Sequence, residues 1–105
     1  MDICKHLPNL QWLLLSLNQL SGQLPTTLSL CGELLTLTLA YNNFTGSIPR
    51  EIGNLSKLEQ IYFRRSSFTG TIPPSFGNLT ALQHLDLGEN NIQGNIPKEL
   101  GVSST

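Results

Sequence analysis

Apolar residues recur along this chain at a fixed spacing of 24 residues. The same spacing separates four glycines and four prolines: Gly22, Gly46, Gly70 and Gly94, then Pro25, Pro49, Pro73 and Pro97. Self-similarity at a period of about 20 to 50 residues indicates a solenoid, in which each repeat contacts only its neighbours. The period divides the single domain 1–105 into four units without a gap. They are 7–30, 31–54, 55–78 and 79–102, with 1–6 as part of a preceding coil and 103–105 as a tail.

Each unit contains a short segment in which apolar and polar positions alternate. The inward positions of these segments are Leu13, Leu15, Leu37, Leu39, Ile61, Phe63, Leu85 and Leu87. Because successive side chains of a strand point to opposite faces, the segments predict four strands that stack in one parallel sheet. The predicted fold class is an α/β solenoid, a right-handed superhelix with the parallel sheet on its concave face and little regular helix. A leucine-rich domain with helices of about 10 to 12 residues is the alternative, but such helices do not fit between the glycines and prolines.

Later positions of each unit are predicted to complete the core and the turns. Apolar residues return inward at two further phases: Leu20, Phe44, Phe68 and Ile92, then Leu28, Ile52, Phe76 and Leu100, the second set from a short 3₁₀ turn. Asparagine follows the strand in three units, at Asn18, Asn42 and Asn90, where its amide can bond backbone groups that the bend leaves unpaired. Ser66 stands at this phase in the third unit. A hydroxyl reaches fewer partners than an amide, so we expect a looser turn there.

Composition and charge exclude several classes of partner. The formal net charge is −1 and no stripe of Lys and Arg exists, so nucleic acid and anionic membranes are poor partners. No apolar run reaches the roughly 18 residues of a membrane span, and the N-terminal segment lacks the apolar core of a signal peptide. The sequence holds no phosphate-binding loop, no zinc-protease motif and no kinase motif. We therefore predict no catalytic residue, no metal site and no cofactor.

The repeat pattern LxxLxxLxLxxNxLxGxIPxxLGx resembles the plant-specific class of leucine-rich repeats from Leu7 to Val102. Phrases such as IPREIGNLSKLEQIYF and GNLTALQHLDLGENNIQGNIPKELG are similar to ectodomains of leucine-rich-repeat receptor-like kinases. The resemblance implies a recognition scaffold for a protein or peptide ligand or a co-receptor, on the extracellular face of the plasma membrane, in defence or development. A secreted inhibitor of the polygalacturonase-inhibiting type and a non-functional truncated fragment are the alternatives. Any kinase activity would belong to another domain of the parent protein.

Two departures from that family pattern concern the ends of the stack. The cysteine-rich N-terminal cap and the C-terminal cap of the family are absent, so both end coils are expected to expose apolar surface, and a fragment of a longer ectodomain is the simplest account. Cys31 occupies an inward leucine position, where cysteine usually behaves as a small buried hydrophobe. A disulfide between Cys31 and Cys4, in the partial first coil, is the alternative.

The outward side chains of the predicted sheet are the candidate ligand-binding residues, because folding does not require them. They are Trp12, Leu14, Thr36, Thr38, Tyr41, Tyr62, Arg64, Arg65, His84 and Asp86. Aromatic residues and arginine commonly anchor protein interfaces. The alternative is that these positions are simply solvated.

Two pairs within this set suggest more specific chemistry. Arg64 and Arg65 can grip a carboxylate such as a peptide C-terminus, or they can form a solvated pair that Glu59 and Glu89 neutralise. His84 and Asp86 share a strand face, as a catalytic relay or a pH switch requires, but no nucleophile is evident beside them. Plain surface polarity is the favoured interpretation of that pair.

Three Asn-x-Ser/Thr sequons are candidate glycosylation sites in a secreted parent protein, at Asn43, Asn54 and Asn78. The alternative for Asn54 and Asn78 is a structural role, since both belong to the Gly-Asn-Leu phrase of the repeat.

Overall fold

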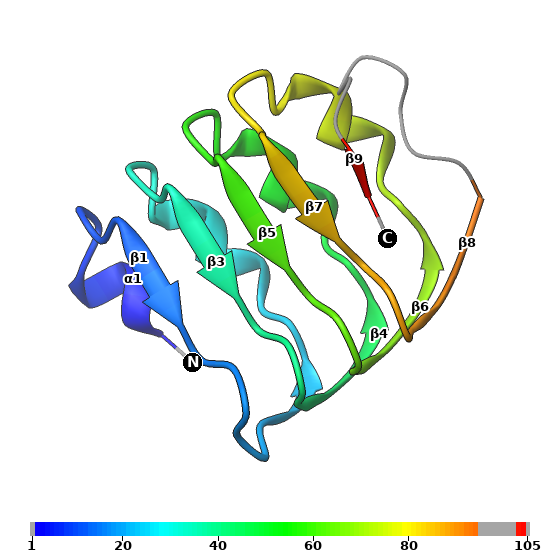
Figure 1. The fold of residues 1–105 in the computed structure, drawn as a ribbon. Coiled ribbons are helices and arrows are strands. Elements are labelled where there is room, and N and C mark those ends of the chain that lie inside the picture. The colour runs from blue at the N-terminus through cyan, green and yellow to red at the C-terminus, as the bar shows by residue number, and fades with distance from the viewer. Residues whose placement is uncertain (1, 95–102, 105) are drawn as a thin grey trace.

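The chain winds through repeated coils, and the computed structural model describes residues 2–94 and 103–104 (Figure 1). Each of the first three full coils runs from a strand of one sheet to a strand of a second sheet and then to a 3₁₀ turn. The elements are α1 (Ile3–His6), β1 (Trp12–Leu14), β2 (Ser21–Gln23), η1 (Thr26–Leu30), β3 (Thr36–Thr38), β4 (Asn43–Ser47), η2 (Arg50–Asn54), β5 (Gln60–Tyr62), β6 (Ser67–Thr71), η3 (Pro74–Asn78), β7 (His84–Asp86), β8 (Asn91–Gln93) and β9 (Ser103–Ser104). The predicted solenoid with parallel strands and little helix is confirmed.

The first sheet contains the strands that the alternating segments predict, in the order β1-β3-β5-β7-β9. All its pairs are parallel, and equivalent residues of successive repeats face each other, as Trp12 faces Thr36 and Thr36 faces Gln60. The prediction of four strands is wrong by one, because Ser103 and Ser104 pair with β7 as a fifth strand. The edge of β7 offers backbone groups for pairing, and the backbone of this short segment pairs with it.

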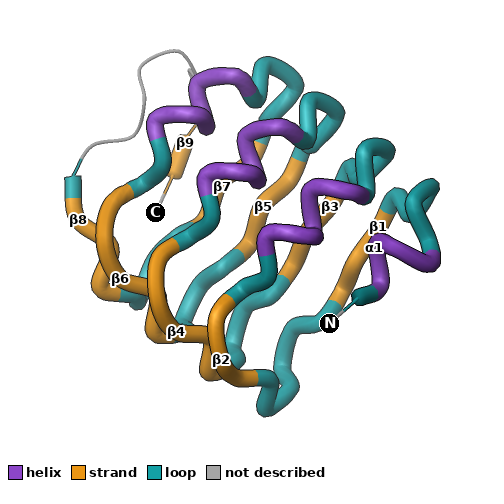
Figure 2. The backbone as a smooth tube through the Cα atoms, turned by 180° about the vertical axis from the view of Figure 1, so that it is seen from behind, coloured by secondary structure: helices purple, strands orange, loops and turns teal. Residues whose placement is uncertain are grey.

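A second parallel sheet, with the order β2-β4-β6-β8, was not predicted from the sequence. Gly22 pairs with Phe44 and Gly46 pairs with Phe68, so this sheet is staggered by two residues relative to the repeat. Its strands β2, β4 and β6 contain the glycine of their repeat, and Gly94 directly follows β8; these glycines have φ between +76° and +87°. A side chain at such a φ is strained, so the repeat keeps glycine here. Seen from behind, the 3₁₀ turns form a row between the two sheets, and α1 ends that row (Figure 2).

The core lies between the sheets and the 3₁₀ turns. Leu37, Leu39, Ile61 and Phe63 of the middle coils are fully buried, as the alternating pattern predicts. Each 3₁₀ turn returns one apolar side chain inward, which confirms the predicted turn at Leu28, Ile52 and Phe76; Leu100 lies outside the described residues. At the N-terminal end, Leu10, Leu15 and Leu20 are only partly buried and Leu7 and Leu30 are about half exposed. The predicted apolar surface of the first coil is therefore present.

The asparagine of the turn connects neighbouring coils. The side-chain nitrogen of Asn42 donates to the carbonyl oxygens of Leu15, Leu39 and Ala40 at 2.9, 3.0 and 3.2 Å, and its oxygen accepts from the backbone of Leu20. Asn42 is nonetheless buried, with 6% of its surface exposed. Every polar atom of the amide thus replaces a backbone partner that the bend removed.

The same ladder continues from the fourth coil to the third. Asn90 donates to the carbonyl oxygen of Phe63, and its side-chain oxygen accepts from the backbone of Ser66 and Phe68. Asn18, in the first coil, bonds the carbonyl oxygens of Leu15 and Ser16, which belong to its own coil, and within the described residues its side chain bonds no other coil.

The third coil breaks the ladder, as the sequence predicts. The hydroxyl oxygen of Ser66 is buried and has no hydrogen-bond partner among the residues that the structure describes. The hydroxyl is too short to make the bond that Asn42 and Asn90 each make to the carbonyl oxygen of the preceding coil. The second and third coils therefore lack the asparagine bonds that join the first coil to the second and the third to the fourth.

The variant Ser66→Asn is expected to stabilise the protein by about 1 kcal/mol, because the new amide restores bonds between two coils and removes an unsatisfied hydroxyl. Urea denaturation of the variant and the native chain measures the difference. Ser66→Ala is the matched control, since it removes the orphan hydroxyl without adding an amide. Equal stability of Ser66→Asn and Ser66→Ala would show that the amide does not enter the ladder.

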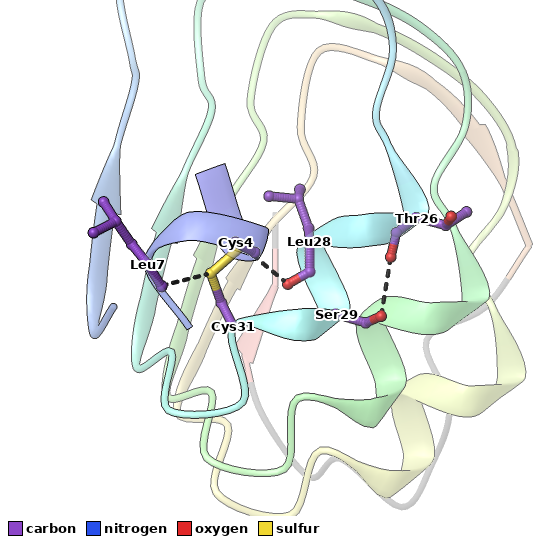
Figure 3. The surroundings of a disulfide bond; sticks show 6 residues. All are labelled: Cys4, Leu7, Thr26, Leu28, Ser29 and Cys31. Carbon is purple, nitrogen blue, oxygen red and sulfur yellow. Dashed lines mark hydrogen bonds between the residues drawn. A yellow bond between two sulfur atoms is a disulfide. The ribbon is translucent and has the colours of Figure 1, made fainter. Parts of the chain in front are cut away.

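The two cysteines form a disulfide that ties α1 to the stack (Figure 3). The prediction of Cys31 as a small buried residue is right about its burial, with 0% exposed, but wrong about its chemistry, and the alternative pairing with Cys4 is the one observed. Helix α1 packs against η1, and this contact brings the Cα atoms of Cys4 and Cys31 to 5.0 Å. The sulfur of Cys4 also lies 3.5 Å from the carbonyl oxygen of Leu28. The short helix therefore covers part of the core at the N-terminal end.

Candidate functional site

The outward face of the first sheet carries an apolar patch over its first two coils. The patch consists of Trp12, Leu14, Leu17 and Tyr41, which are 58%, 64%, 78% and 42% exposed. Their inward neighbour Leu13 is only 4% exposed. The parallel sheet holds this patch in place through backbone bonds, so the patch has a fixed shape that a ligand can meet without paying much ordering entropy.

The third and fourth coils carry charge on the same face. The guanidinium of Arg64 donates to the carboxylate of Asp86 at 2.9 Å and to that of Glu89 at 3.4 Å. Gly88 makes room for this arrangement, because a Cβ there would lie 2.6 Å from the guanidinium of Arg64. The hydrogen bond and the charge of Asp86 raise the pKa of Arg64 above its ordinary value. Arg64 thus remains charged at every physiological pH and is already bound to two acids of this chain.

A hollow of about 310 Å³ opens where the strands of the first sheet end. It is lined by Tyr41, Asn42, Asn43, Arg65, Ser66 and Ser67. The guanidinium of Arg65 stands over the ring of Tyr41 at 5.9 Å from its centre. Both residues have positive φ, 57° and 58°, so the backbone turns their side chains away from the strand direction. The sequence did not predict this hollow, although the serine at the ladder position of the third coil was a signal for it.

The two arginines therefore differ in their surroundings, which sequence reasoning did not resolve. Arg64 lies across the fourth coil toward Asp86, whereas Arg65 lies over Tyr41 and forms no ion pair within the described part of the chain. Glu89 contributes to neutralisation as the alternative interpretation expected. Of this pair, Arg65 is the one whose charge is available to a ligand.

The other candidates on this face are spread over the sheet. Thr36, Thr38 and Tyr62 are partly exposed, and His84 is exposed at the start of β7. Asp86, on the same strand, accepts a hydrogen bond from Arg64 and another from the backbone of Gly88. Within the described residues, no three acidic, histidine or cysteine side chains gather as a metal site requires.

All three sequon asparagines are exposed. Asn43 begins β4 and lines the hollow, whereas Asn54 and Asn78 end η2 and η3. A search of the described helices finds none with the length and hydrophobicity that crossing a bilayer needs.

Comparison with known proteins identifies the repeat. The family model described as Leucine Rich Repeat matches the chain four times, at residues 9–31, 33–55, 57–79 and 81–102. A search of curated proteins finds no match.

Solved structures similar to this chain include ectodomains of plant receptor kinases. The ectodomain of GASSHO1/SCHENGEN3 from Arabidopsis thaliana, in complex with CASPARIAN STRIP INTEGRITY FACTOR 2, is 42% identical with a TM-score of 0.89 over 96% of this chain. The ectodomain of the Arabidopsis receptor kinase HAESA, in complex with an IDA peptide hormone, is 41% identical with a TM-score of 0.85 over 90% of this chain. The plant peptide hormone receptor RGFR1, in complex with RGF2, is 38% identical with a TM-score of 0.89 over 96% of this chain. This chain spans only 12%, 16% and 16% of those three proteins.

Proposed function

Since the chain belongs to the leucine-rich repeat family, we propose that it is a recognition scaffold for a protein or peptide ligand and part of the extracellular ligand-binding domain of a plant receptor kinase. The single observation that carries the proposal is the exposed apolar patch on the outward face of the first sheet, formed by Trp12, Leu14, Leu17 and Tyr41. Large apolar side chains cost solubility when they stay exposed, and a cluster of them on a rigid face is typical of an interaction site. Two of the similar proteins, the peptide hormone receptor RGFR1 and HAESA in complex with an IDA peptide hormone, support a peptide as the occupant.

The arrangement of the face suggests how a ligand is oriented. The apolar patch lies at the first two coils, and Arg65 stands at the edge of the third with no acid of this chain bound to it in the described residues. An extended peptide with apolar residues at one end and a carboxylate near the other fits this order of side chains. Arg64 is already paired with Asp86 and Glu89 of this chain, so it contributes little to the affinity for a ligand.

The size of the face limits the affinity. Four strands of three residues, spaced about 4.8 Å apart and rising about 3.3 Å per residue, cover far less than the roughly 800 Å² per partner of a stable interface. The 105-residue chain alone is therefore expected to bind peptides with a Kd of about 1 μM or weaker. A longer stack of coils binds more tightly because it presents more of the same face.

The proposal is tested by selecting peptides from a random-sequence display library against the immobilised chain. Peptides selected on the native chain are expected to lose about tenfold or more of their affinity for the variant Trp12→Ala/Tyr41→Ala, because truncated aromatic anchors cost about 1.4 kcal/mol or more. The matched control is Leu30→Ala, which truncates an exposed apolar residue of η1 on the opposite side of the coil. Selected peptides that bind the double variant as well as the native chain would contradict the proposal.

A further inference from the structure

Asn54 and Asn78 occupy the same place in neighbouring coils. Each is the last residue of a 3₁₀ turn, η2 and η3, and each is exposed. The next residue, Leu55 or Leu79, is fully buried, and the hydroxyl residue after it is exposed again. Each sequon therefore presents its asparagine and its hydroxyl residue to solvent, while the leucine between them anchors the segment in the core.

The coil does not use the amides of these two asparagines. Asn42 and Asn90 each form four or more side-chain hydrogen bonds, but the side chains of Asn54 and Asn78 form none among the described residues. The first coil has Leu30 at the equivalent position, also as the last residue of its 3₁₀ turn, and this coil folds in the same way. The fold thus does not require asparagine here, and the structural interpretation of the Gly-Asn-Leu phrase leaves both amides without a role.

We propose that Asn54 and Asn78 carry N-linked glycans, which cover the rim where the 3₁₀ turns lead into the strands of the first sheet. The donor is a lipid-linked oligosaccharide diphosphate of the secretory pathway. The side-chain nitrogen of the asparagine forms a bond to C1 of the first sugar, the bond between C1 and the phosphate oxygen breaks, the amide loses one proton, and the lipid diphosphate leaves. A protein that keeps the Cys4–Cys31 disulfide folds in the oxidising compartment where this transfer takes place.

The glycans would divide the surface of the coil into a closed rim and an open face. Asn54 and Asn78 precede the loops that enter β5 and β7, so the glycans stand at the edge where these strands begin. The 3₁₀ turns that carry them lie side by side behind the first sheet (Figure 2). The hollow with Tyr41 and Arg65 lies at the other edge, where the strands end. Protein partners are therefore kept from the rim and left free to approach the apolar patch.

The third sequon has a different position and is not part of the proposal. Asn43 lines the hollow, so a glycan there would stand over Tyr41 and Arg65. A glycan on Asn43 as well would show that every sequon is modified. An unmodified Asn43 would show that modification is confined to the two sequons on the rim.

The test is site-specific mass spectrometry of the full chain, secreted from plant cells by means of a cleavable signal. Glycopeptides that contain Asn54 and Asn78 are expected, and the variants Ser56→Ala and Thr80→Ala should each remove one glycan, seen as one step in gel mobility. Thr45→Ala is the matched control at the third sequon and should leave both rim glycans in place. Unmodified Asn54 and Asn78 in the secreted native chain, or a glycan on Asn43 alone, would overturn the proposal. The measurement needs no ligand, so its outcome is independent of the proposed recognition function.

Discussion

Replacing Asn42 with alanine is expected to lower the free energy of unfolding by about 3 kcal/mol. The substitution removes four side-chain hydrogen bonds. It takes from the carbonyl oxygen of Leu39 and the amide of Leu20 the partner they have in the native chain, whereas the carbonyl oxygen of Leu15 keeps its bond from Asn18. Because Asn42 is buried, water reaches these backbone groups poorly, and each unsatisfied group carries a desolvation cost of about 1–3 kcal/mol. Urea denaturation followed by far-ultraviolet circular dichroism measures the loss.

Asn18 offers a matched control for that substitution. It stands at the same phase of the repeat, but it is exposed and its two hydrogen bonds stay within its own coil. Asn18→Ala is therefore expected to cost less than about 1 kcal/mol, since water can replace the lost bonds. If both variants lost the same stability, the ladder between coils would not be the source of the effect.

The positions that repeat with period 24 were the ones that sequence could predict. The inward leucines, the 3₁₀ turns and the asparagine ladder each follow from a pattern that all or most units share, so one unit supports the interpretation of the next. Even the defect at Ser66 was visible, because a departure from a strict repeat stands out against it. The second sheet was not predicted from the sequence, because its strands, such as Ser21–Gln23, are short, polar and interrupted by glycine, which is not the composition of a typical strand.

The side-chain contacts on the candidate binding face could not be predicted from the repeat pattern. The sequence places outward residues on the face but does not say how long side chains bend across it. Arg64 folds over Gly88 to reach Asp86 in the next coil, and Arg65 turns onto Tyr41 in the previous coil, although the two arginines are adjacent in the chain. These contacts depend on which side chains of the neighbouring coil lie beside each arginine. The pairing of Cys4 with Cys31 is of the same kind, because it depends on how α1 packs, and no repeat unit contains α1.

The disulfide between Cys4 and Cys31 is expected to contribute about 3 kcal/mol to stability. The two cysteines are 27 residues apart, and closing a loop of that length removes about 3 to 4 kcal/mol of chain entropy from the unfolded state. The variant Cys4→Ala/Cys31→Ala should show this loss in urea denaturation, and the reducing agent TCEP should produce a similar loss in the native chain. TCEP should leave the double variant unchanged, which separates the disulfide from other effects of the reagent.

The loss is expected to be concentrated at the N-terminal end of the stack. In a solenoid each coil contacts only its neighbours, so the stability of one end is only weakly transmitted to the other. Without the disulfide, α1 leaves η1 and uncovers Leu28 and the partly buried residues of the first coil. Hydrogen exchange of the double variant should therefore speed up most at the backbone amides of Leu15 and Leu17, and least at those of Phe63 and Arg65, which also bond across the first sheet but two coils further on. Equal acceleration at all four amides would show instead that the disulfide holds the whole stack as one cooperative unit.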